Sequence, residues 1–277
     1  MPPGAPAARL GRREGGFALI ETTQSETGSQ YQLQTLMRGA AVLDLLADND
    51  YLTLKQVATS LELDTTTAYR LLKTWASAGY LDYDSTTKRY HAGVGLLRLA
   101  SKSHTSSGLP DVEARLRTIN RKVEQTTSFS VLAGRFVLYV ARVVANRALM
   151  YQVEIGKTLP AYATSSGHVL LAYVPHDKLL ELFPDEELMG FTEHTVRNRT
   201  ELLASLATVR EQGYAINRGQ LGSSVAAVAV PARDADGEVV GAFSIAGPGQ
   251  HFTSDDIYRR YLPALLEAAR EAVKVVR

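Results

Sequence analysis

The sequence predicts a multi-domain α+β protein with an N-terminal winged helix-turn-helix, linker helices and a C-terminal domain containing an antiparallel sheet. Three apolar helical patterns follow one another within residues 35–79, and a hairpin pattern comes directly after them. From residue 128 to the end, strand and helix patterns alternate. The length of 277 residues, 45% of them hydrophobic, suits two domains that each bury a core.

Composition excludes several classes of protein. The chain has no cysteine, which rules out a disulfide scaffold, thiol catalysis and metal sites held by thiolates. No stretch approaches 18 consecutive apolar residues, and the first residues lack the basic-then-apolar pattern of a secretion signal, so we expect a cytoplasmic protein with no membrane partner. A net charge of +1 argues against a bulk polyanion binder, although local basic surfaces remain possible.

Residues 1–30 predict a disordered tail, because they are rich in Gly, Pro, Ala, Ser and Thr and show no sustained apolar period. Arg9, Arg12 and Arg13 could contact phosphates there. A solvated tail is the favoured interpretation.

The first three elements of the domain predicted over residues 31–92 are helices. Leu36, Ala40, Leu43 and Ala47 form an apolar stripe on the first helix. The second helix begins at Thr53, and Gln56 stands at the capping-box spacing. A break over residues 62–65 leads into the third helix, with Asp64 or Thr65 placed to cap it, Trp75 as a core anchor and Gly79 to end it.

The third helix and the hairpin after it carry the candidate DNA contacts. Two strands at residues 80–83 and 89–91 flank a polar turn, which completes a winged helix-turn-helix. Residues 31–92 hold six basic and seven acidic residues, yet four of the six cations lie on the third helix or the wing. A solvated helical interaction module is the alternative. The predicted major-groove contacts are Thr65, Thr66, Tyr69, Arg70 and Lys73, and the predicted wing contacts with phosphate or the minor groove are Lys88 and Arg89.

Residues 93–127 predict linker helices, interrupted near residues 106–110, which could space the two halves of a dimer. The C-terminal domain is then expected over residues 128–277. Its predicted strands are 128–133, 136–144, 149–154, 225–232 and 239–246, and its predicted helices are 164–173, 178–183, 201–212 and a closing helix from Thr253 or Ser254.

From Leu36 to Val276 this pattern resembles the isocitrate-lyase-regulator (IclR) family of bacterial transcription factors. The resemblance rests on several motifs in order: Leu63-Asp64-Thr65-Thr66-Thr67-Ala68-Tyr69-Arg70-Leu71-Leu72, Gly79-Tyr80-Leu81, Leu159-Pro160-Ala161-Tyr162-Ala163-Thr164-Ser165-Ser166-Gly167, Gly213-Tyr214-Ala215, Val228-Ala229-Val230-Pro231 and Ser244-Ile245-Ala246-Gly247-Pro248. It implies a C-terminal effector-binding domain related to the GAF fold, and a homodimer or dimer of dimers on double-stranded operator DNA. Repression relieved by a small organic acid or aromatic compound is the more common outcome in such a family.

The resemblance also implies where an effector binds. By position, the matching residues are Leu159, Ser165, Ser166, Asn217, Val225, Ala227, Ser244 and Ala246. Thr164 joins them, because Thr164, Ser165 and Ser166 open a helix whose free N–H groups and hydroxyls favour an anion. An ordinary helix cap on a solvated turn is the alternative. Residues 216–220 lack the acidic residues of the family pattern, Ala227 replaces a cysteine or serine, and Ala246 replaces a serine, which favours a larger organic acid or an aromatic compound.

No enzyme pattern emerges from the sequence. The Gly-x-Ser-x-Gly elbow, the phosphate-binding loop and the Gly-x-Gly-x-x-Gly turn are all missing, and the histidines form no metal-binding pair, so we expect no catalysis, cofactor or metal. The competing hypothesis is a small-molecule-binding or serine-hydrolase-type protein whose N-terminal helices serve oligomerisation. Ser165 or Ser166 with His168 would then be the reactive pair, although His168 is expected at the helix surface or over the pocket.

Overall fold

The computed structural model describes residues 33–106, 108–145 and 153–274. The predicted tail over residues 1–30 lies outside them. The chain forms two compact units that divide between Val94 and Gly95, and each unit is described by itself below. The predicted α+β architecture is confirmed.

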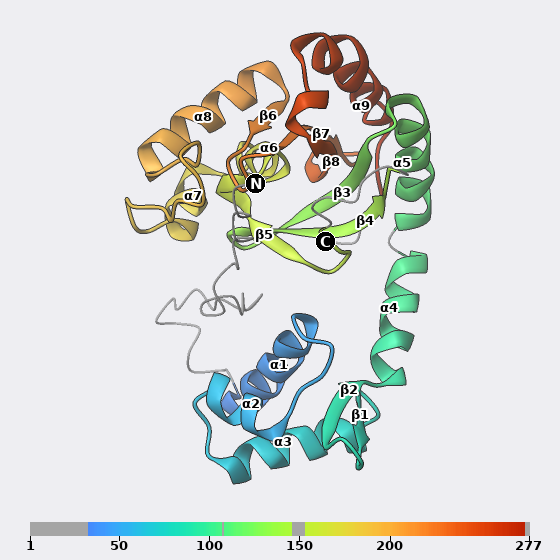
Figure 1. Ribbon diagram of the computed structural model, residues 1–277, viewed down its shortest axis with the longest axis vertical. Helices are drawn as coiled ribbons and strands as arrows, with labels where there is room; N and C mark the ends of the chain where they lie inside the picture. Colours follow the sequence, from blue (N-terminus) through green and yellow to red (C-terminus); the bar gives the residue numbers. More distant parts are fainter. Residues whose placement is uncertain (1–32, 107, 146–152, 275–277) are drawn as a thin grey trace, which may run out of the picture. The chain divides into compact units, whose positions relative to one another are not determined.

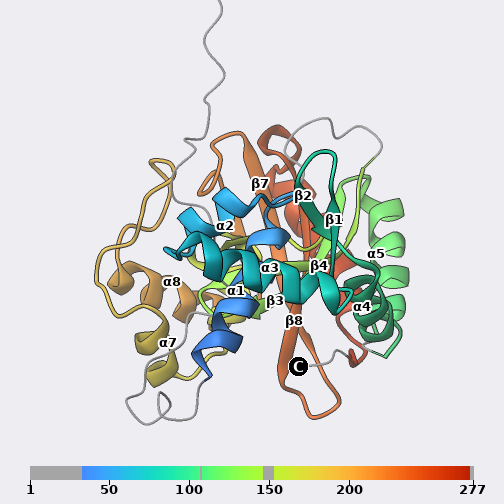
Figure 2. The ribbon, with the colours of Figure 1, turned by 90° about the horizontal axis from the view of Figure 1, so that it is seen from below.

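The N-terminal unit is a winged helix-turn-helix. It consists of α1 (Gln34–Ala47), α2 (Leu54–Ser60), α3 (Thr65–Ser77) and an antiparallel hairpin of β1 (Leu81–Asp84) and β2 (Arg89–Ala92) (Figures 1 and 2). Each helix and strand of this unit contributes at least one buried apolar side chain. These are Val42, Val57, Leu72, Leu81 and Tyr90, and Leu52 before α2 is buried as well.

Local capping explains where α2 and α3 begin. Thr53 and Gln56 form the predicted capping box, in which each side chain bonds the backbone N–H of the other residue. Asp64, rather than Thr65, caps α3, since its carboxylate accepts from the N–H and the hydroxyl of Thr67 at 2.9 and 2.6 Å. These bonds lower the pKa of Asp64.

The C-terminal unit contains a six-stranded antiparallel sheet in the order β5-β4-β3-β8-β7-β6. Its strands are β3 (Thr126–Ala133), β4 (Phe136–Val143), β5 (Thr158–Pro160), β6 (Ala215–Arg218), β7 (Val225–Arg233) and β8 (Val239–Pro248). Both predicted hairpins, β3–β4 and β7–β8, are confirmed. The strand predicted over residues 149–154 lies mostly outside the described residues, and β5 and β6 were not predicted.

Helices cover both faces of this sheet (Figures 1 and 2). On one face, α5 (Leu109–Val123), a π-helical turn (Asp256–Tyr261) and α9 (Leu262–Ala268) pack on an apolar core. On the other face lie α6 (Ser165–Leu171), α7 (His176–Leu182) and α8 (Arg199–Gln212). The sequence predicts α5 as one of the linker helices, yet four of its apolar residues are buried in this core, namely Val112, Leu116, Ile119 and Val123. This leaves α4 (Val94–Ser106) as the connecting helix.

Candidate effector pocket and DNA-binding surface

Strand alternation separates the two faces of the C-terminal sheet. Along β7, Val228 and Val230 enter the core under α5 and α9, so Ala227 and Ala229 point to the face that α6 covers. Residues opposite each other across an antiparallel ladder share a face. The register therefore places two rows on the α6 face: Asn217–Ala227–Ala246–Thr126, and Ala229–Ser244–Ser128–Arg142.

All residues of these rows except Ala229 line the floor of a pocket with a volume of about 1270 Å³, which is open to one side. Of the nine residues predicted to bind the effector, eight line it. They are Leu159, Thr164, Ser165, Asn217, Val225, Ala227, Ser244 and Ala246. The small side chains at Ala227 and Ala246 leave room above the sheet, as expected from their place in the sequence. The pocket is larger than the roughly 300–1,000 Å³ common for small-ligand sites.

Ser166 is the exception and does not line the pocket. Successive residues of an α-helix are turned by about 100°, so Ser165 and Ser166 cannot both face the same cavity. Ser166 is buried, and its hydroxyl has no hydrogen-bond partner within the described residues. Thr164 caps α6 by accepting from the N–H of Gly167 at 3.0 Å. The structure thus places Ser166 in the interior and not among the residues that line the pocket.

Asn217 lines the pocket and also holds its wall together. Its Nδ2 donates to the carbonyl of Ala163 at 2.7 Å, and its Oδ1 accepts from the N–H of Gln220 at 3.0 Å. The amide therefore joins the segment before α6 to the loop that follows β6. An acidic side chain at this position would offer no donor to the Ala163 carbonyl.

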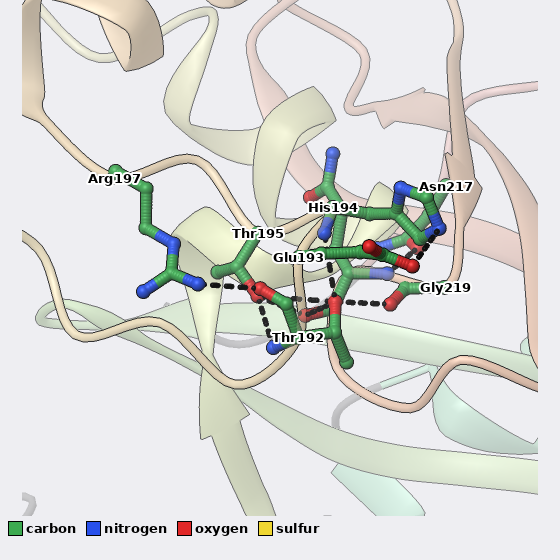
Figure 3. Close-up of polar contacts among 8 residues, drawn as sticks. Thr192, Glu193, His194, Thr195, Arg197, Asn217 and Gly219 are labelled. Carbon is green, nitrogen blue, oxygen red and sulfur yellow. Dashed lines mark hydrogen bonds and ion pairs between the residues drawn. The ribbon is translucent and has the colours of Figure 1, made fainter.

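The loop between α7 and α8 is hydrogen-bonded to the loop that follows β6 and so stabilises the same wall (Figure 3). Thr192 Oγ1 donates to the carbonyl of Gly219 at 2.6 Å, and Thr195 Oγ1 donates to the carbonyl of Gln220 at 2.5 Å. Arg197 closes the loop by donating to the carbonyl of Thr192 at 2.9 Å. Leu221 to Val225, which follow these anchored carbonyls, all line the pocket.

His168 lies in the interior, 4% exposed, and not at the helix surface or over the pocket as expected. Its Nε2 is 2.7 Å from the carbonyl of Tyr162, which can only accept, so Nε2 carries the proton. Nδ1 then accepts from the hydroxyl of Ser205 at 3.1 Å. Nε2 thus links α6 to the turn before it, and Nδ1 links α6 to α8, so His168 has no nitrogen left to activate Ser165 or Ser166.

Burial lowers the pKa of His168, which makes the free energy of unfolding dependent on pH. The unfolded chain takes up a proton below about pH 6.5 while the folded chain resists it, so stability is complete above that pH and falls below it. We expect the free energy of unfolding to drop by at most about 1.4 kcal/mol per pH unit from this group. Urea unfolding at pH 7.5 and 5.5 checks this.

His168→Gln should be less sensitive to the same pH change, whatever its absolute stability. The control is His176→Gln at the exposed start of α7, which should keep the wild-type dependence. An equally steep pH dependence in His168→Gln would contradict the assignment.

Arg142 is a half-buried charged residue of the pocket that the sequence does not predict. It lies on β4 opposite Ser128, lines the pocket and is half-buried. Burial lowers the pKa of its guanidinium, although the group stays charged at neutral pH. In the sequence it stands within the run Phe136-Val137-Leu138-Tyr139-Val140-Ala141-Arg142-Val143, where both faces look apolar, so only the observed register reveals the direction in which it points.

The predicted DNA contacts form an exposed surface of the N-terminal unit. On α3 the buried residues are Ala68, Leu71 and Leu72, which turn the opposite side of the helix to solvent. Six of the seven predicted side chains are exposed, namely Thr65, Thr66, Tyr69, Arg70, Lys73 and Lys88. Each could therefore reach a nucleic acid without rearrangement of the core.

Arg89 is half-buried, because its guanidinium lies over the ring of Tyr51 at 3.8 Å from the ring centroid. Tyr51 thus fixes the position of a wing cation. Removing the ring should lower DNA affinity about 2- to 5-fold, in line with a cation–π contact of roughly 0.5–1 kcal/mol. Tyr51→Ala should leave the salt dependence of binding unchanged, whereas Arg89→Ala should reduce the salt slope by about one counterion.

Fluorescence anisotropy over a salt series checks this, with Tyr51→Phe as the matched control that keeps the ring. Wild-type affinity in Tyr51→Ala would show that Arg89 needs no support.

Two family models match this chain, one at each unit. Residues 35–85 match the IclR helix-turn-helix domain, and residues 110–274 match the C-terminal domain described as "Bacterial transcriptional regulator IclR C-terminal". The chain belongs to the IclR family. It is a DNA-binding transcriptional regulator with a ligand-binding C-terminal domain.

Relatives of this IclR-family regulator match most of its length. The Pca regulon regulatory protein of Pseudomonas putida is 29% identical, over 90% of this chain and 86% of that protein. A putative transcriptional regulator from Rhodococcus sp. RHA1 is 33% identical with a TM-score of 0.70, over 86% of this chain and 96% of that one. A double mutant of the PobR inducer-binding domain from Acinetobacter, solved with 3-hydroxybenzoic acid, is 27% identical with a TM-score of 0.54, over 58% of this chain and 94% of that one.

No described helix is both long and apolar enough to cross a membrane. Across the same part of the chain, no three His, Asp or Glu side chains gather in a way that could hold a metal ion.

Proposed function

We propose that this regulator binds operator DNA as a homodimer or dimer of dimers and that an aromatic or other organic acid in the C-terminal pocket lowers its affinity for that DNA. The observation that best supports DNA binding is the exposed face of α3. It combines hydroxyls, a phenol and two cations, which are the groups that read base edges and hold phosphates. Lys88 and Arg89 on the wing would add phosphate or minor-groove contacts.

Exposed apolar side chains on α4 support self-association. Val94, Leu97 and Leu99 are 71%, 66% and 51% exposed, which is unfavourable for a helix that stays in water. A second copy of the chain would cover such residues and pair two recognition helices. Pairing would in turn match a pseudo-palindromic operator.

The pocket supports an organic acid as effector. Its floor carries alanines and serines together with Thr126 and Asn217, its wall carries Leu159, Val225 and Leu221, and Arg142 supplies a half-buried positive charge. Such a lining suits an apolar body with few polar groups. The relative solved with 3-hydroxybenzoic acid shares the family fold, which supports aromatic acids as first candidates.

Catalysis forms no part of the proposed function. Both His168 nitrogens are engaged in packing, and the nearest hydroxyl partner of the ring is Ser205 rather than Ser165 or Ser166. The relatives are regulators and not enzymes. Repression relieved by ligand is therefore the proposed mode of action.

Fluorescence anisotropy on the DNA upstream of the protein's own gene, against a scrambled duplex at near-physiological salt, tests the proposal. We expect specific binding about 1,000-fold tighter than to the scrambled duplex. Adding 3-hydroxybenzoate or 4-hydroxybenzoate should weaken it by about 5- to 150-fold, the usual range of allosteric coupling. Equal affinity for both duplexes, with and without either acid, would contradict the regulatory assignment.

A further inference from the structure

Among the half-buried arginines described in the C-terminal unit, only the guanidinium of Arg142 has no ion pair, hydrogen bond or aromatic ring beside it; that of Arg135 lies 5.6 Å from the centroid of the Phe183 ring. Arg115 is paired with Asp111 at 2.8 Å and donates to the carbonyls of α9 and the segment after it, and Arg199 is paired with Glu186 at 3.2 Å. The guanidinium of Arg142 makes no hydrogen bond or ion pair with the described residues, and its Nε is buried. An unpartnered charge in a partly desolvated site is costly unless something binds it.

The surroundings of Arg142 belong to the pocket. The register sets it beside Ser128, which is opposite Ser244, so the cation continues a row of two hydroxyls across β3 and β8. Tyr139 and Ala145 from its own strand region line the same cavity. The guanidinium therefore lies at the β4 end of a floor whose other side chains are uncharged.

We propose that Arg142 is the anion anchor of the effector pocket and binds the carboxylate of an aromatic acid whose ring lies over the alanine and serine rows of the sheet. The proposal rests on the proposed function and specifies the effector end that the protein recognises. A guanidinium binds a carboxylate through two parallel N–H bonds, which fixes orientation as well as charge.

The geometry also predicts what the pocket rejects. A primary amide has the shape of the acid but no negative charge, so it would leave the half-buried guanidinium without a counterion. Sites with a buried polar group that the ligand must satisfy discriminate strongly against analogues that cannot do so. We therefore expect an acid to bind about 10- to 100-fold tighter than its amide, the range of charged hydrogen bonds in proteins.

The test uses the full chain and paired probes: benzoate, 3-hydroxybenzoate and 4-hydroxybenzoate, each against its primary amide, by isothermal titration calorimetry at pH 7.5. At least one acid should bind at least 10-fold tighter than its amide. Arg142→Met should lower the affinity for that acid to the affinity for its amide. The affinity of Arg142→Lys for the acid should lie between those of the wild type and Arg142→Met. Circular dichroism checks that the variants fold. Where a variant does not fold, the ratio of acid affinity to amide affinity in the wild-type protein still tests whether the pocket prefers a negative charge.

Two arginine controls remove a positive charge elsewhere. Arg121→Met removes the other described arginine that lines the pocket, which is exposed and donates to the Thr118 hydroxyl at 3.4 Å, and Arg259→Met removes an exposed arginine on the π-helical turn. Both variants should keep the acid preference. The proposal is overturned if acids and amides bind equally, if Arg142→Met keeps the preference, if Arg121→Met loses it, or if no acid binds at 10 mM. Operator binding without added ligand is measured separately, so its loss would count against the regulatory function instead.

Discussion

Replacing Arg70 by alanine is expected to reduce specific operator affinity by at least about 100-fold while leaving the fold and effector affinity unchanged. Arg70 is exposed near the middle of α3, two residues before the buried Leu72, and its side chain makes no contact that the core needs. A guanidinium that pairs bidentately with a guanine contributes about 1–3 kcal/mol of discrimination, and truncation also removes a phosphate-attracting charge. Anisotropy on the operator and on a scrambled duplex measures both losses.

Arg70→Lys separates charge from geometry. Lysine keeps the positive charge, so binding to the scrambled duplex and the salt slope should stay near wild type. It lacks the planar fork, so the ratio of specific to non-specific affinity should fall about 10-fold or more. Arg38→Ala on α1, also exposed, is the control for losing a charge from the same unit. Full operator affinity in Arg70→Ala would refute the docking of α3.

The N-terminal unit was predictable because local rules determine it. The capping pair Thr53–Gln56, the cap at Asp64 and the apolar stripe of α3 are short-range features, and each survives in the structure. Exposure of Arg70 and Lys73 then follows from helical periodicity alone. The stacking of Arg89 on Tyr51 was not predictable, because the two residues belong to different elements.

The pocket was predictable only in part, because it depends on register between distant strands. Ala227, Ala246 and Ser244 share a face through ladders that a strand pattern does not specify. The β3–β4 ladder also shifts register between Phe129 and Ser130, and such an irregularity changes which β4 residues oppose β3. The direction of Arg142 depends on that ladder. The burial of His168 likewise arises from α8 packing over α6, a contact between segments 37 residues apart.

Gly167→Ala is expected to destabilise the C-terminal unit by about 1–3 kcal/mol, the usual cost of overpacking. Helix propensity predicts the opposite sign, since alanine normally stabilises a helix by about 1 kcal/mol relative to glycine. The structure decides for destabilisation, because a Cβ at Gly167 would lie 2.0 Å from the carbonyl oxygen and 2.4 Å from the Cα of Ala161. Both atoms are backbone, so relief requires α6 to move away from residues 161–163.

That movement should reach the effector. Ala163 and Thr164 line the pocket, and Asn217 holds the Ala163 carbonyl, so displacing this segment opens the wall that contains them. For the fraction of Gly167→Ala molecules that is folded, we expect effector affinity to fall more than 10-fold. A wall that is no longer pre-formed must be ordered when the ligand binds, and this costs free energy. Gly134→Ala is the matched control, because Gly134 has open space around it and only its φ of 58° opposes a side chain. Neutral surface substitutions change the free energy of unfolding by up to about 0.5 kcal/mol. If urea unfolding gives a change no larger than this for Gly167→Ala, α6 is not in tight contact with Ala161.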